Sequence, residues 1–163
     1  MPSPNANAIF GVFLSPSQEL DDGTIIPSRP LGPDEPRIQF SCHPSRREYT
    51  LTAPVIFRDP TGKIWRSEKG SKFDGATIPR FFWRWARPEE HDLLGAAAIH
   101  DDLCAHLRDP SKSVQCSSEA AAMVFWLMIR ASGVRPSKAW CMWAAVRFFG
   151  PQFDGPHVWG TSL

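Results

Sequence analysis

The amino-acid sequence predicts an α+β domain, in which a small antiparallel sheet of two to four strands is followed by about three helices. Residues 37–67 are rich in the alternating, β-branched and aromatic side chains that favour strands. After Pro79 the apolar spacing becomes helical, and Ser and Gly residues stand where the last two helices should begin and end. A chain of 163 residues suits one domain with a substantial core, which we assign to residues 37–150.

Residues 1–36 are predicted to form a Pro-rich N-terminal arm. They are rich in Pro, Ser and Asn, and their one apolar island, Ile9–Leu14, is too small to form a core alone. Such an arm is ordered when a partner or a neighbouring subunit holds it, so we expect it to take part in assembly. Residues 151–163 are loop-like and form a C-terminal tail.

Two strands, Tyr49–Phe57 and Lys63–Ser67, are predicted on either side of a tight turn. The turn is "DPTG", residues 59–62, in which Pro and Gly occupy positions that a β-turn favours. Arg37–Cys42 is a third candidate strand. An antiparallel hairpin with one further strand therefore precedes the helices.

The last two predicted helices have clear start and stop signals. Ser117 or Ser118 is the expected N-cap of a helix that ends at Gly133, because a hydroxyl accepts a hydrogen bond from the first backbone N–H groups and Gly suits the position after a helix. The same signals recur in the final helix, with Ser137 as its cap and Gly150 as its stop.

Composition argues against several classes of function. A net charge of +1 provides no general attraction for nucleic acid, and the longest apolar run, Ala120–Ile129, is too short for a membrane span. No export signal opens the chain, so we expect folding in the cytosol with reduced thiols. The cysteines show no CxxC pair of the kind found in zinc ribbons; they are Cys42, Cys104, Cys116 and Cys141.

A His-Asp pair lies on the first predicted helix, 89–107, which should end near Pro110. Small residues one turn away on either side leave room around the imidazole of His100. Asp101 and Asp102 diverge from His100 by about 100° and 200°, so at most one of them shares its site. His100 is therefore a general base, a metal ligand or a core histidine that donates to a backbone carbonyl.

A second polar segment precedes this helix. Asp74 and Thr77 are either a turn-and-cap device or part of a site shared with His100. In the structural alternative, Arg80 pairs with one of the helix carboxylates. The resulting buried polar cluster contains Asp74, Thr77, Arg80, His100, Asp101 and Asp102.

We expect no cofactor, although two metal sets are weakly indicated. His100 and Cys104 are one turn apart and, with Cys116, would supply three zinc ligands, but a fourth is not evident. The other candidate set for calcium or zinc is His100, Asp101 and Cys104.

Large aromatic side chains recur along the last two predicted helices. They are more numerous than one core-facing stripe requires, and the surplus favours an interface. These residues are Phe125, Trp126, Trp140, Trp143, Phe148 and Phe149.

Three segments, "FDGATIPR" from Phe73, "AAAIHDDLC" from Ala96 and "AAVRFFG" from Ala144, together resemble a phage and prophage family known as domain of unknown function 1353. The resemblance spans residues 56–150 and implies a phage-encoded protein made in the host cytoplasm. The matching positions are Asp74, Gly75, Ala76, Ile78, Pro79, Arg80, His100, Asp101, Leu103, Phe125, Ala145, Val146, Arg147 and Gly150.

Three departures from the family pattern bear on mechanism. Phe73 and Cys104 replace a Thr and a Tyr, and Ala122 stands where the family carries an Asp. If the family site pairs His100 with that Asp, this chain has lost the carboxylate, and Glu119, one turn earlier, is the possible substitute. The His-Asp helix is also similar in layout to phospholipase A2 enzymes, but the Gly-rich calcium loop of those enzymes is missing.

Two functions follow as expectations. In the first, the chain is a virion or tail-associated structural protein, located in the virion, that contacts other virion proteins or copies of itself through the arm and the Trp-rich helices. In the second, it is a hydrolase of cell-envelope lipid or peptidoglycan. Its catalytic residues would be His100, Asp101 and Asp74, with Glu119 as the substitute carboxylate.

Overall fold

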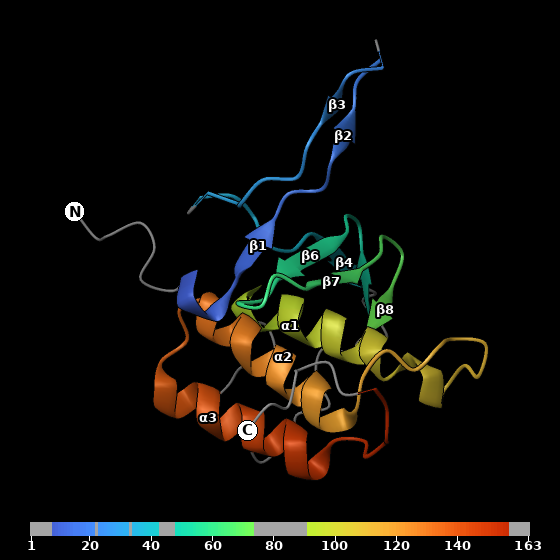
Figure 1. Cartoon of the computed structure of the whole chain (residues 1–163), viewed down its shortest axis with the longest axis vertical. Coiled ribbons are helices and arrows are strands. Elements are labelled where there is room, and N and C mark those ends of the chain that lie inside the picture. The colour runs from blue at the N-terminus through green and yellow to red at the C-terminus, as the bar shows by residue number, and fades with distance from the viewer. Residues whose placement is uncertain (1–7, 22, 33, 43–47, 74–90, 157–163) are drawn as a thin grey trace.

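A computed structural model describes residues 8–21, 23–32, 34–42, 48–73 and 91–156. Its strands lie on one side of a helical layer, as Figure 1 shows, and the predicted α+β architecture is confirmed. The elements in chain order are η1 (Ala8–Phe10), β1 (Val12–Leu14), β2 (Gln18–Glu19), β3 (Ile25–Ile26), β4 (Phe40–Cys42), β5 (Tyr49–Leu51), β6 (Val55–Arg58), β7 (Ile64–Ser67), β8 (Lys72–Phe73), α1 (His91–Leu103), η3 (Ala105–Leu107), α2 (Ser118–Ala131) and α3 (Pro136–Phe149).

The first sheet has the antiparallel order β1-β6-β7. The predicted turn between β6 and β7 is confirmed, and Phe57 pairs with Phe13 of β1 on one side and with Trp65 of β7 on the other. Phe57 is fully buried, and Phe13 is nearly so. The segment predicted as an arm therefore also supplies a strand to the core.

The second sheet has the antiparallel order β4-β5-β8. Its strand β4 confirms the third predicted strand in part, and Tyr49 of β5 stacks on Phe73 of β8 with 5.5 Å between the ring centroids. The prediction of one strand over Tyr49–Phe57 is wrong, because β5 and β6 belong to different sheets. The chain changes sheet at residues 52–54, where Pro54 has no N–H to continue a ladder.

Strands β2 and β3 form a separate two-stranded ribbon that projects from the rest of the molecule (Figure 1). At its base Arg29 donates to both carboxylate oxygens of Glu35, at 2.7 and 2.6 Å, and the Gly32 N–H donates to the same carboxylate at 2.6 Å. These hydrogen bonds lower the pKa of Glu35 to about 2. The clamp at the base therefore persists down to strongly acidic pH.

The helix boundaries agree with the predicted signals in part. Ser117 is the N-cap of α2, where its hydroxyl accepts from Ala120 N at 3.3 Å, and Gly133 follows the helix with a φ of 90°. Ser137 as the cap of α3 is wrong, because the helix begins at Pro136, whose fixed φ suits the first position. The start predicted for the first helix lies outside the described residues.

The core lies between the sheets and α2, with α1 in the middle. α1 packs against β6, β7 and β8 on one side and α2 on the other. Its residues Ala96, Ala97 and Ala98 are buried, and such small side chains allow the neighbouring elements to approach closely. Within the described ranges, no helix is long and apolar enough to cross a membrane.

We predict that Asp59→Ala lowers the free energy of unfolding by about 2–4 kcal/mol. Asp59 is buried, and its carboxylate accepts from Thr61 N at 2.8 Å, Thr61 Oγ1 at 2.6 Å, Lys63 N at 3.1 Å and Trp65 Nε1 at 2.7 Å. Urea denaturation measures the change.

Asp109→Ala is the matched control for this substitution. Asp109 makes the same local turn, accepting from Ser111 N at 3.0 Å and Ser111 Oγ at 2.6 Å, but it is exposed. We expect a loss below about 1 kcal/mol at this position. Equal losses of unfolding free energy in the two variants would show that the burial of Asp59 does not increase its contribution to stability.

Candidate functional site

The predicted site residues lie at the C-terminal end of α1. His100, Asp101 and Asp102 occupy its last turns, and α1 is held there between α2 and the β7 and β8 strands. All three side chains are within the described part of the chain, whereas Asp74, Thr77 and Arg80 lie outside the described residues. The site can therefore be built from the α1 side.

His100 is enclosed. It is 7% exposed, and its ring meets Phe125 of α2 edge to face with 6.0 Å between the centroids. The Sγ atom of Cys104 lies 3.9 Å from Nε2 and 4.0 Å from Nδ1. An imidazole covered by an aromatic ring and a thiol has the surroundings of a core histidine.

Asp101 is buried beside this imidazole. Its Oδ1 atom lies 3.9 Å from His100 Nδ1, and its side chain is 9% exposed. Its Oδ2 atom is buried and has no hydrogen-bond partner among the residues that the structure describes. An unsatisfied buried carboxylate oxygen is costly, so the described packing does not explain this oxygen.

Asp102 links α1 to the sheets by hydrogen bonds. Its Oδ2 atom accepts hydrogen bonds from Ser67 Oγ on β7 and from Ser71 Oγ at 3.0 Å, just before β8. Lys112 Nζ lies 3.7 Å from the other carboxylate oxygen. The described partners of Asp102 are thus two serines and a lysine, which the sequence prediction missed.

Asp101 and Asp102 line a surface hollow of about 470 Å³, which we call the Asp101 hollow. His100 is not among the residues that line it. Three acidic and three basic side chains line the hollow, so it has no single sign of charge. The lining residues are Gly70, Ser71, Lys72, Asp101, Asp102, Ala105, Arg108, Asp109 and Lys112.

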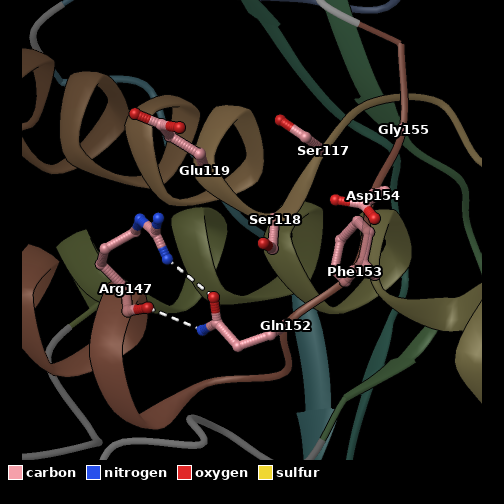
Figure 2. Close-up of a pocket in the computed structure, with 8 residues that line it drawn as sticks. All are labelled: Ser117, Ser118, Glu119, Arg147, Gln152, Phe153, Asp154 and Gly155. Carbon is pink, nitrogen blue, oxygen red and sulfur yellow. Dashed lines mark hydrogen bonds between the residues drawn. The ribbon is translucent and has the colours of Figure 1, made fainter.

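Glu119 lies in a different place. Figure 2 shows it on the first turn of α2, beside a second hollow of about 490 Å³ that is also lined by Arg147, Gln152 and Asp154. Arg147 donates to Gln152 Oε1 at 2.7 Å, and the Gln152 amide donates back to Arg147 O at 2.7 Å. The two hollows share no lining residue, so the structure does not bring Glu119 to the Asp101 hollow.

Ala122, which stands where the family pattern carries an Asp, lies on the side of α2 that faces His100. Ala122 and Phe125 are one turn apart on α2, both are buried, and Phe125 contacts His100. A carboxylate at residue 122 would therefore lie on the helix face that meets the imidazole. In this chain that face carries Ala122 and Phe125, so residue 122 supplies no carboxylate.

Cys104 and Cys116 are buried thiols. Burial raises the pKa of Cys104 to about 12, with a smaller contribution from the nearby Asp101, and burial also raises the pKa of Cys116. Within the described part of the chain, no three His, Cys, Asp or Glu side chains form a group that could hold a metal.

Comparison with known proteins identifies the family of this chain. The chain matches the family described as "Protein of unknown function (DUF1353)" over residues 49–146, from β5 into α3, and it belongs to that family. The predicted resemblance is thereby confirmed. The match begins after the β2–β3 ribbon, so the ribbon lies outside the matched region.

Two curated relatives come from Sinorhizobium fredii. Uncharacterized protein y4jT is 30% identical over 149 residues, which are 91% of this chain and 40% of the relative. Uncharacterized protein y4iH is 32% identical over 105 residues, which are 63% of this chain and 41% of the relative. The chain thus spans about two fifths of the length of each, and no solved structure matches.

We predict that Cys104 and Cys116 resist alkylation by iodoacetamide at pH 8 in the native protein, whereas exposed Cys42 reacts. The reason is that burial raises the pKa of both thiols and shields them. Peptide mass spectrometry gives the modified fraction at each site, and alkylation in urea is the control for intrinsic reactivity. Rapid native labelling of Cys104 would contradict its enclosure.

Proposed function

We propose that this chain is a phage-encoded virion or tail-associated protein, made in the host cytoplasm, that works through protein–protein contacts. The observation that carries the proposal is an aromatic row on the outer side of α3. Trp140 is 62% exposed and Phe148 is 68% exposed, and half-buried Trp143 lies between them, with ring centroids 6.4 and 6.2 Å away. Contiguous exposed aromatic surface of this kind is typical of interaction sites.

The enclosed site on α1 supports the same proposal. A hydrolytic His must reach its substrate or an activated water, and His100 is covered by Phe125 and does not line the Asp101 hollow. Asp102 is occupied by Ser67 and Ser71. The contacts of His100 and Asp102 are thus those of a packed helix end, which supports a function carried by the surface.

One observation favours the second candidate, a hydrolase of cell-envelope lipid or peptidoglycan. The Oδ2 atom of Asp101 is buried and has no hydrogen-bond partner within the described ranges, and Asp101 lines a hollow large enough for a small ligand. Unsatisfied buried groups are characteristic of functional sites, where stability is traded for chemistry. The hydrolase requires His100 to act together with this carboxylate.

We predict that His100→Ala lowers the free energy of unfolding by about 1–3 kcal/mol and leaves the metal content of the purified protein unchanged. Elemental mass spectrometry of the native chain and the variant measures the metal. His106→Ala is the matched control, because His106 is a half-buried histidine outside the His100 contacts. A stoichiometric calcium or zinc that disappears only with His100→Ala would favour the hydrolase instead.

We also predict that the chain is a fixed component of phage particles. Particles from a producing strain would be banded on a density gradient and washed in high salt, and peptide mass spectrometry would give the copy number per particle. A constant copy number that survives the wash is expected. Presence in the lysate and absence from the washed particles would contradict a virion role.

A further inference from the structure

We propose that this chain binds a second copy of itself head to tail, with the β2–β3 ribbon of one copy lying on the aromatic row of α3 in the next. The inference rests on the proposed function and names the partner. In this proposal, the exposed ribbon at one end of the molecule and the exposed aromatic row of α3 at the other end bind each other in neighbouring copies.

The ribbon has little reason to be stable by itself. Every described residue from 17 to 30 is exposed, and a two-stranded hairpin alone is marginal in water. Its apolar side chains face solvent, since Leu20 is 45% exposed, Ile25 67% and Ile26 42%. A partner that covers these side chains would stabilise the ribbon by the ordinary hydrophobic effect.

The base of the ribbon holds it in a fixed direction. Ser15 N donates to Arg29 O at 2.8 Å, and Arg29 N donates back to Ser15 Oγ at 3.2 Å. Arg29 is bound on its other side by the carboxylate of Glu35. Because the base is already ordered, docking would cost less entropy than the capture of a free arm.

The charges of the two surfaces are complementary. Residues 18–28 contain three acidic residues and no basic one, and the nearby Arg29 is neutralised by Glu35. α3 contains no acidic residue, and exposed Arg135 immediately precedes the helix. Arg147 lies over the Phe148 ring at 5.9 Å and also lines the hollow beside Glu119. An acidic, aliphatic ribbon therefore fits a basic, aromatic helix face.

The arrangement of the two surfaces determines the kind of assembly. Figure 1 shows the ribbon at one end of the long axis and α3 at the opposite end, with the sheets, α1 and α2 between them. The ribbon of one copy cannot reach its own α3, so the contact joins different surfaces of two copies. Such a heterologous contact repeats, and it builds a ring when the rotation closes or a filament when it does not.

The test uses two single substitutions that each remove one surface. Ile25→Asp places a charge on the apolar surface of the ribbon, and Trp140→Glu places one in the aromatic row of α3. Both positions are exposed, so the fold should tolerate these substitutions. Ile64→Asp and Met123→Glu are matched controls on β7 and α2, at 48% and 37% exposure. Analytical ultracentrifugation of the wild type over a concentration series should show association that both controls retain.

Each surface variant alone should be monomeric under the conditions where the wild type associates, with affinity reduced at least about tenfold. Mixed together, they should form a 1:1 heterodimer, because the variant with an intact ribbon can bind the one with an intact α3. The heterodimer should not grow further, since its remaining ribbon and its remaining α3 face both carry the disrupting substitution. Higher salt should weaken it by screening the complementary charges.

Other outcomes overturn the inference. Self-association that survives either substitution, or a mixture that stays monomeric, would mean that the contact is not ribbon to α3. A wild type that remains monomeric at about 100 µM would mean that a different protein covers these surfaces. If the protein is monomeric but is found in washed particles, the proposed function stands and the self-assembly proposal fails. If the protein self-associates but is absent from washed particles, the self-assembly proposal stands and the virion role fails.

Discussion

The close packing of α1 between the sheets and α2 is the constraint on which the rest of the structure depends. The helix touches β6, β7 and β8 on one side and α2 on the other, and the small side chains of Ala96 and Ala97 at its middle allow these elements to approach closely. Leu94 and Ile99, on either side of this small-residue stretch, are buried and fill the core. His100, Asp101 and Asp102 follow in the last turns of the helix.

The same constraint explains why these polar residues are mostly occupied. Asp102 accepts from Ser67 and Ser71, which fixes the end of α1 to the first sheet and to the approach to β8. Phe125 covers His100 because α2 lies directly against α1. Among the described residues, the Oδ2 atom of Asp101 has no hydrogen-bond partner. A motif that is typical of catalysis in sequence is thus largely absorbed by packing in space.

Local signals in the sequence predicted the elements, and non-local contacts explain what it missed. The turn at residues 59–62 and the Ser117 cap involve neighbouring residues, so they were predictable. The partners of Asp102 are 31 and 35 residues away, and no spacing rule connects them. A buried Ser67 at an inward position of β7 was the available hint, since an inward serine needs a polar partner.

Although the net charge is only +1, the acidic and basic residues are unevenly distributed along the chain. This distribution would favour a head-to-tail orientation of neighbouring copies. The acidic ribbon lies at one end of the long axis, and α3, which has no acidic residue, lies at the other. In the proposed assembly, contacts between two ribbons or between two α3 faces would be disfavoured by like charges, while opposite ends would attract. Because the Debye length is about 8 Å in physiological salt, this preference acts at close approach and selects the orientation of docking. In that assembly the aliphatic and aromatic side chains would supply the binding free energy, and the charges would select which ends meet.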